Sequence, residues 1–132
     1  MASRVEGDIF INVQGDEPMM DPHAIEVALK LVTSGEFKMS TAMTPMKDAE
    51  DLENVAVVKV LADKKKRAIY FSRFAIPYSR APHVEGTPFI CRRHVGLYVY
   101  RRETLMSITA LPVSAIERGE SLEQLRALED GV

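Results

Sequence analysis

Residues 8–18 form a strand-like run that breaks abruptly into a polar turn. Asp8 to Val13 is mostly β-branched and aromatic, which predicts a buried strand. The sequence Gln14-Gly15-Asp16-Glu17-Pro18 then follows, at the carboxyl edge where open α/β sheets bind ligands. Asp16 could hold a divalent metal against phosphates, or it could cap backbone amides in a surface turn. The spacing leaves both interpretations open.

Helical and strand patterns follow one another along the rest of the chain. Asp21 is a good N-cap before Pro22, and Gly35 is a good stop, so a helix is expected between them. Further strands are expected at 39–43, 55–61, 68–71 and 93–100. Further helices are expected at 48–52, 103–110 and 114–128, the last of them broken near Gly119, with a proline-rich loop at 76–88. This order predicts an α/β fold with some antiparallel pairing in a single domain, 1–132.

Composition excludes several classes of protein. The 132 residues are 46% hydrophobic, and 17 basic against 19 acidic residues give a net charge of -2. Such a balance favours neither nucleic acid nor an anionic membrane as a partner. No run approaches the roughly 18 apolar residues of a membrane span, so no membrane insertion is expected. Cys91 is the single cysteine, so no intrachain disulfide can form, which suits the cytoplasm.

Two arginines and a strand histidine are candidate binding groups. Arg73 and Arg80 flank a proline-fixed bend, where they could bind a carboxylate or phosphate bidentately or simply pair with surface carboxylates. His94 and Tyr98 are four apart on a predicted strand and so share a face. They could bind polar ligand groups, although a lone strand histidine is more often structural.

A cluster of charged residues lies in the tail. It consists of Glu117, Glu120, Glu123, Gln124 and Arg126. On a helix, residues three apart are neighbours, and a solvated acidic face is the default interpretation of such a cluster.

Four blocks together resemble one family. They are Asn12 to Pro18, Tyr70 to Arg73 with Ile76-Pro77, Arg93 to Arg101, and Leu122 to Arg126. In order and spacing the chain resembles the 3-deoxy-manno-octulosonate (Kdo) cytidylyltransferases, also called CMP-Kdo synthetases. The resemblance implies a nucleotide-diphospho-sugar transferase-like fold, with a mixed, mostly parallel sheet and a small antiparallel excursion. It also implies transfer of CMP from CTP to Kdo for lipopolysaccharide synthesis, with pyrophosphate as the second product.

The same resemblance implies roles for particular residues. Asp16 is implied to be a catalytic carboxylate that binds Mg²⁺, and Gln14 to contact the sugar. The remaining implied sugar-pocket residues are Arg73, Arg80, His94, Tyr98, Glu123 and Gln124. CTP and Kdo are the implied small-molecule partners, and the family is typically a homodimer.

The sequence also departs from the family pattern. The family's glycine- and arginine-rich nucleotide loop and its second metal aspartate segment have no counterpart here, so we expect a partial domain truncated at both ends. We therefore expect the isolated chain to be inactive. Without further strands beside it, Ile9 to Val13 would present an open strand edge, which predicts an oligomer or a swapped dimer. Alternatives are a non-catalytic oligomerising module, or a cytidylyltransferase for a related sugar such as 8-amino-Kdo or an acylneuraminate.

Overall fold

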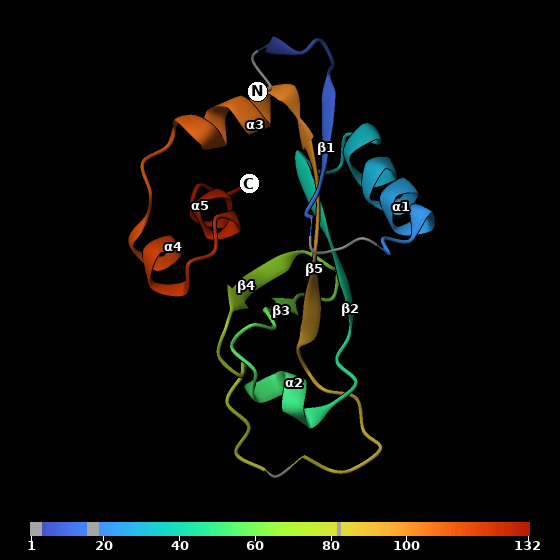
Figure 1. Ribbon diagram of the computed structural model, residues 1–132, viewed down its shortest axis with the longest axis vertical. Helices are drawn as coiled ribbons and strands as arrows, with labels where there is room; N and C mark the ends of the chain where they lie inside the picture. The colour runs from blue at the N-terminus through green and yellow to red at the C-terminus, as the bar shows by residue number, and fades with distance from the viewer. Residues whose placement is uncertain (1–3, 16–18, 82) are drawn as a thin grey trace. The chain divides into compact units, whose positions relative to one another are not determined.

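The computed structural model describes residues 4–15, 19–81 and 83–132, and Figure 1 shows its helices and strands. The chain forms two compact units. Unit 1 comprises Met1–Ala42, Val95–Pro112 and Glu129–Val132, and unit 2 comprises Met43–His94 and Val113–Leu128. Strand β5 (Arg92–Arg101) contributes residues to both units. The expectation of one domain over 1–132 stays a prediction.

Unit 1 is built on the second half of β5. Strand β1 (Ile9–Val13) pairs with β5 in antiparallel register, from Ile9 opposite Arg101 to Val13 opposite Leu97. Helix α1 (Pro22–Thr33) packs Ala28 and Val32 against Leu97 and Val99 of β5, and these four buried side chains form the core of the unit (Figure 1). Helix α3 (Arg102–Ala110) also belongs to unit 1, and strand β2 (Met39–Pro45) does so as far as Ala42.

The predicted ends of α1 are confirmed. The Asp21 carboxylate accepts a hydrogen bond from the His23 backbone N–H at 2.9 Å, as an N-cap should. Gly35 has a φ of +84° just after the helix, a conformation that glycine adopts without steric cost.

Strand β1 differs from its prediction in burial. Ile9 and Phe10 are half-buried, while Ile11 is 44% exposed and Val13 is 40% exposed, so the expectation of a buried strand over Asp8 to Val13 is wrong. The reason is that β1 is the end strand of the observed order and pairs only with β5 among the described residues. The open, apolar strand edge expected for Ile9 to Val13 is therefore confirmed.

The strand directions among the described residues differ from the expected mostly parallel sheet. The three pairings with a described register are all antiparallel. The Arg101 backbone N–H donates to the Lys38 carbonyl, and the Thr41 hydroxyl donates to the Leu97 carbonyl, so β2 also runs opposite to β5. Strands β1 and β2 therefore share a direction, as a β-α-β unit requires, but β5 lies between them. Parallel neighbours were expected because the sequence does not show that a distant strand inserts there.

Unit 2 contains a hairpin covered by two short helices. Strands β3 (Lys59–Ala62) and β4 (Ala68–Ser72) pair in antiparallel fashion, and β3 also pairs with Arg92 and Arg93 at the start of β5. Helices α4 (Ala115–Glu120) and α5 (Gln124–Glu129) follow later in the chain. Leu122 and Leu125 pack against Val60 and Phe71 of the hairpin. Helix α2 (Ala49–Glu53) is the remaining helix of the unit.

Two element boundaries in unit 2 differ from the sequence prediction. Strand β3 begins at Lys59 rather than at Val55, because the Asn54 side chain accepts from the Ala56 N–H and its carbonyl accepts from the Val57 N–H, which folds 54–57 into a turn. The expected break in the C-terminal helix is present, but it lies at Ser121, with a φ of 53°, rather than at Gly119.

Two further expectations concern Cys91 and the membrane. Cys91 is buried with Met46 and Val57 in a small apolar cluster, and burial raises the pKa of its thiol. Among the described residues, no helix has both the length and the apolar character needed to cross a bilayer.

Candidate functional site

The predicted site residues fall into three groups by position. Asp16, the candidate metal ligand, lies outside the described residues. Unit 1 holds Gln14 and Tyr98, and unit 2 holds Arg73, Arg80, His94, Glu123 and Gln124. The surroundings of each group are described within its own unit.

Gln14 is fixed against a glycine of β5. Its backbone N–H donates to the Gly96 carbonyl at 2.8 Å. A Cβ atom added to Gly96 would lie only 2.9 Å from both Cβ and Cδ of Gln14. Gly96 therefore leaves the space in which the exposed Gln14 amide lies, which is a recognised reason for glycine inside a strand. No role was predicted for Gly96, although a glycine within an apolar strand was the available signal.

Tyr98 is buried within unit 1. Only 5% of it is exposed, it lies opposite Asn12 of β1, and its ring stacks near that of Tyr100 with centroids 6.0 Å apart. The ring thus contributes to packing within unit 1.

Arg73 follows the end of β4 and is bound to backbone carbonyls on two sides. Its Nε donates to the Glu120 carbonyl at 2.8 Å, Nη1 to Val55 at 3.1 Å and Nη2 to Ser121 at 3.3 Å. Both Nη atoms carry a second N–H group, so the fork can still be offered to an anion.

Glu120 is the acceptor at the end of β4. Its carboxylate accepts from the Ser72 hydroxyl at 2.6 Å and from the Arg73 backbone N–H at 2.9 Å. Glu120 was expected to be part of a solvated acidic face, and that interpretation is wrong for this residue. No local pattern indicates this partnership, because Glu120 and Arg73 are 47 positions apart in the chain.

Lys59 is a buried cation that the sequence analysis also missed. It has no exposed surface, and its ammonium donates to the carbonyls of Asn54, Val57 and Arg73 at 2.9, 2.7 and 2.5 Å. Burial lowers its pKa, partly offset by Cys91, Glu53 and Glu120. A lysine inside the β-branched run 55–61 was the available signal.

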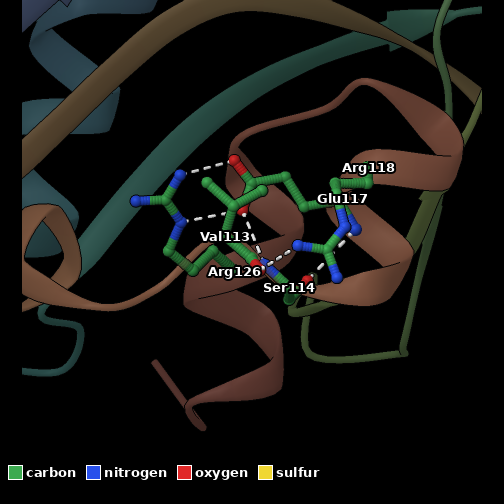
Figure 2. Close-up of polar contacts among 5 residues, drawn as sticks. All are labelled: Val113, Ser114, Glu117, Arg118 and Arg126. Carbon is green, nitrogen blue, oxygen red and sulfur yellow. Dashed lines mark hydrogen bonds and ion pairs between the residues drawn. The ribbon is translucent and has the colours of Figure 1, made fainter.

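Helices α4 and α5 are joined by a bidentate ion pair. Arg126 donates to Glu117 through Nε at 2.7 Å and through Nη2 at 2.5 Å, and Figure 2 shows this pair beside the capping residue Ser114. The hydrogen bond from Arg126 lowers the pKa of Glu117. Glu123 and Gln124 lie between the two paired residues in sequence, Glu123 exposed and Gln124 buried.

His94 is a neutral imidazole near pH 7. Burial lowers its pKa from 6.5 to about 4, and its ring meets Phe71 edge-on with centroids 5.1 Å apart. A neutral ring can donate or accept a hydrogen bond, but it contributes no positive charge to the binding of an anion.

Arg80 lies exposed in the loop predicted at 76–88, which contains no helix or strand among its described residues. A shallow surface groove of about 490 Å³ also lies in unit 2. It is lined by residues 46–49, 83 and 85–89, so it includes none of the predicted site residues. In the described part of the chain, no three His, Cys, Asp or Glu side chains gather as a metal site would require.

Within unit 2, the Arg73 guanidinium lies just after the end of β4 and can bind an anionic group. The class of protein is defined by a comparison with known families. Residues 1–132 match the cytidylyltransferase family throughout. The chain belongs to that family.

Several curated proteins are similar to this chain in sequence. The chain is 46% identical over 132 residues to a 3-deoxy-manno-octulosonate cytidylyltransferase of Solibacter usitatus, covering 99% of this chain and 51% of that protein. It is 42% identical over 137 residues to the protein of the same name from Syntrophotalea carbinolica, covering 99% of this chain and 55% of that protein. The chain thus spans about half the length of these relatives.

A solved structure confirms the fold. CMP:2-keto-3-deoxy-manno-octonic acid synthetase, solved in complex with CTP, superimposes with a TM-score of 0.86 at 39% identity. The match covers 99% of this chain and 53% of the solved one. The predicted nucleotide-diphospho-sugar transferase-like fold is therefore confirmed.

Proposed function

We propose that the protein carrying this chain transfers CMP from CTP to Kdo and releases pyrophosphate. The observation that supports this most strongly is the similarity over 99% of the chain to a CMP-Kdo synthetase solved with CTP. The names of the curated relatives support the same sugar.

The proposed reaction brings two anionic substrates together. A hydroxyl of Kdo attacks the α-phosphorus of CTP, the bond to the bridging oxygen breaks, and pyrophosphate leaves in line. Catalysis then depends on alignment and on neutralising negative charge. Because His94 is neutral, the protein's positive charge for the sugar comes from Arg73 and Arg80 in this account, while Gln14, His94, Tyr98, Glu123 and Gln124 would contribute polar contacts and shape.

Magnesium is part of the proposal through Asp16. Asp16 would hold the ion, as the resemblance to the family implies. A bound Mg²⁺ would neutralise phosphate charge.

We expect Asp16→Asn to raise the Mg²⁺ concentration required for half-maximal rate at least tenfold, measured by magnesium titration of initial rates. An unchanged magnesium requirement would remove Asp16 from the metal site.

Location and assembly are proposed as well. A cytoplasmic location agrees with Cys91 as the single cysteine of the chain and with CTP as the nucleotide donor. A homodimer agrees with the exposed apolar edge of β1.

The sugar assignment is tested by product identity. The native-length protein is incubated with CTP, Mg²⁺ and either Kdo, 8-amino-Kdo or an acylneuraminate, and the CMP-sugars are identified by mass spectrometry. We expect CMP-Kdo at the highest kcat/KM. A preference for either other sugar would reassign the substrate, and the absence of every CMP-sugar would contradict the proposed function.

A further inference from the structure

We propose that Glu120 is a positioning residue for the anionic sugar acid, acting through Arg73. The inference rests on the proposed function, because it takes Arg73 to contact the sugar. Glu120 itself lies on α4 and binds the protein's own groups rather than the substrate.

The geometry connects Glu120 to Arg73 at two points. The Glu120 carboxylate accepts the Arg73 backbone N–H at 2.9 Å, and the Glu120 carbonyl accepts the Arg73 Nε–H at 2.8 Å. The first bond fixes the main chain of Arg73 and the second fixes the direction of its side chain. Glu120 therefore helps to fix both the main-chain position of Arg73 and the direction of its guanidinium.

A second charge acts on the other side of the same residue. The buried Lys59 ammonium donates to the Arg73 carbonyl at 2.5 Å. The Arg73 N–H thus meets an anion and its C=O meets a cation, and hydrogen bonds to charged groups are stronger than neutral ones. The main chain of Arg73 is held from both ends, immediately after β4 ends at Ser72.

This bonding has a consequence for binding. An arginine side chain is ordinarily mobile and loses rotamer freedom when it binds a ligand. Bonds to the carbonyls of Glu120, Val55 and Ser121 restrict the Arg73 fork before any ligand arrives. The second N–H groups on Nη1 and Nη2 are then presented to a carboxylate in a fixed direction. The Glu120 carboxylate holds the Arg73 main chain from which this side chain starts, so its loss should shift the guanidinium and weaken sugar binding specifically.

The test is a double-mutant cycle in the native-length protein. Glu120→Ala, Arg73→Ala and the double variant are compared for the KM of Kdo and the KM of CTP. We expect Glu120→Ala to raise the KM of Kdo about tenfold, with the KM of CTP changed less than twofold. In the Arg73→Ala background, Glu120→Ala should change the KM of Kdo less than twofold, because its route to the sugar is gone.

Controls separate positioning from folding. Glu120→Gln retains an acceptor for the Arg73 N–H, so we expect it to recover a large part of the Kdo affinity. Glu129→Gln, on an exposed carboxylate of α5, should leave both KM values unchanged. Amide hydrogen exchange over residues 72–74 requires no substrate. It should accelerate in Glu120→Ala but not in Glu129→Gln, so it tests the hydrogen bond from the Arg73 N–H to the Glu120 carboxylate even if the wild-type protein makes no CMP-Kdo.

The contradicting results are equally definite. Equal effects of Glu120→Ala with and without Arg73, or a change in kcat with both KM values unchanged, would overturn the positioning role. Unchanged exchange at residues 72–74 would overturn the structural bond itself. A wild-type protein without CMP-Kdo synthesis would instead overturn the proposed function.

Discussion

At the residue scale, the site depends on small features that set where a side chain can lie. Gly96 leaves space for Gln14, Glu120 fixes Arg73, and the surroundings of His94 keep its ring uncharged. Each is a local packing or hydrogen-bonding effect that a single substitution can test.

Gly96→Ala should move Gln14 without unfolding the protein. The added methyl group would lie within 2.9 Å of Gln14 carbons, and the exposed Gln14 side chain can swing towards solvent. Loss of one amide contact to the sugar corresponds to a rise of about tenfold in the KM of Kdo, measured by initial-rate kinetics. The control is Gly119→Ala, since a Cβ there meets nothing within 4 Å. An unchanged KM in Gly96→Ala would show that Gln14 makes no sugar contact.

His94 should make folding stability depend on acidity. Its folded-state pKa of about 4 lies below the ordinary 6.5, so the unfolded chain binds the extra proton more readily. The stabilisation is complete above pH 6.5 and is lost as pH falls towards 4, by up to about 3 kcal/mol. Urea unfolding at several pH values should show a smaller loss in His94→Gln than in wild type, whereas exposed His23→Gln should follow wild type. Identical pH profiles for His94→Gln and wild type would contradict a buried neutral imidazole.

At the element scale, one ion pair, a capping box and a few apolar contacts stabilise the short helices α4 and α5. Helices α4 and α5 have six residues each, too short to be stable alone. The Glu117–Arg126 pair joins them, and the Ser114 capping box fixes the start of α4 (Figure 2). Leu122 and Leu125 then secure the helices to β3 and β4.

Arg126→Met should therefore destabilise the protein far more than Arg118→Met. Both arginines are on these two helices, but Arg126 pairs with Glu117, with 18% and 7% of the two side chains exposed. Arg118 donates to the Val113 carbonyl from an exposed position. Removing one member of a shielded ion pair strands the other charge, so we expect a loss of unfolding free energy several times that of Arg118→Met in chemical denaturation. Equal losses would show that the pair is not structural.

Element types were largely predictable from sequence, and side-chain partnerships were not. Asp21, Pro22 and Gly35 act locally, so the ends of α1 could be predicted from their neighbours alone. The insertion of β5 between β1 and β2, and the bonds from Glu120 and Lys59 to Arg73, join residues distant in sequence. Periodicity carries no information about such contacts. The roles of Asp16 and of the sugar-pocket residues stay predictions.

At the scale of the whole molecule, the exposed edge of β1 is the dominant feature. Ile11 and Val13 are exposed on a strand that pairs on one side only among the described residues. Such an edge is a template for another strand, from elsewhere in the protein or from a second copy.

The 132-residue chain alone should therefore associate. We expect light scattering after size-exclusion chromatography to give a mass above 14.8 kDa, and Ile11→Lys with Val13→Lys to shift the chain towards monomer. Val27→Lys changes an exposed apolar residue of α1, away from the strand edge, and should not affect association. A clean wild-type monomer at low micromolar concentration contradicts the prediction.

The central proposal is that the protein carrying this chain joins CMP to Kdo. The most direct measurement is Kdo-dependent release of pyrophosphate from CTP by the native-length protein, with CMP-Kdo quantified in the same samples. The account predicts equal amounts of the two products, and a raised KM for Kdo when Arg73 is replaced by alanine. Folded protein that releases no pyrophosphate in response to Kdo would contradict it.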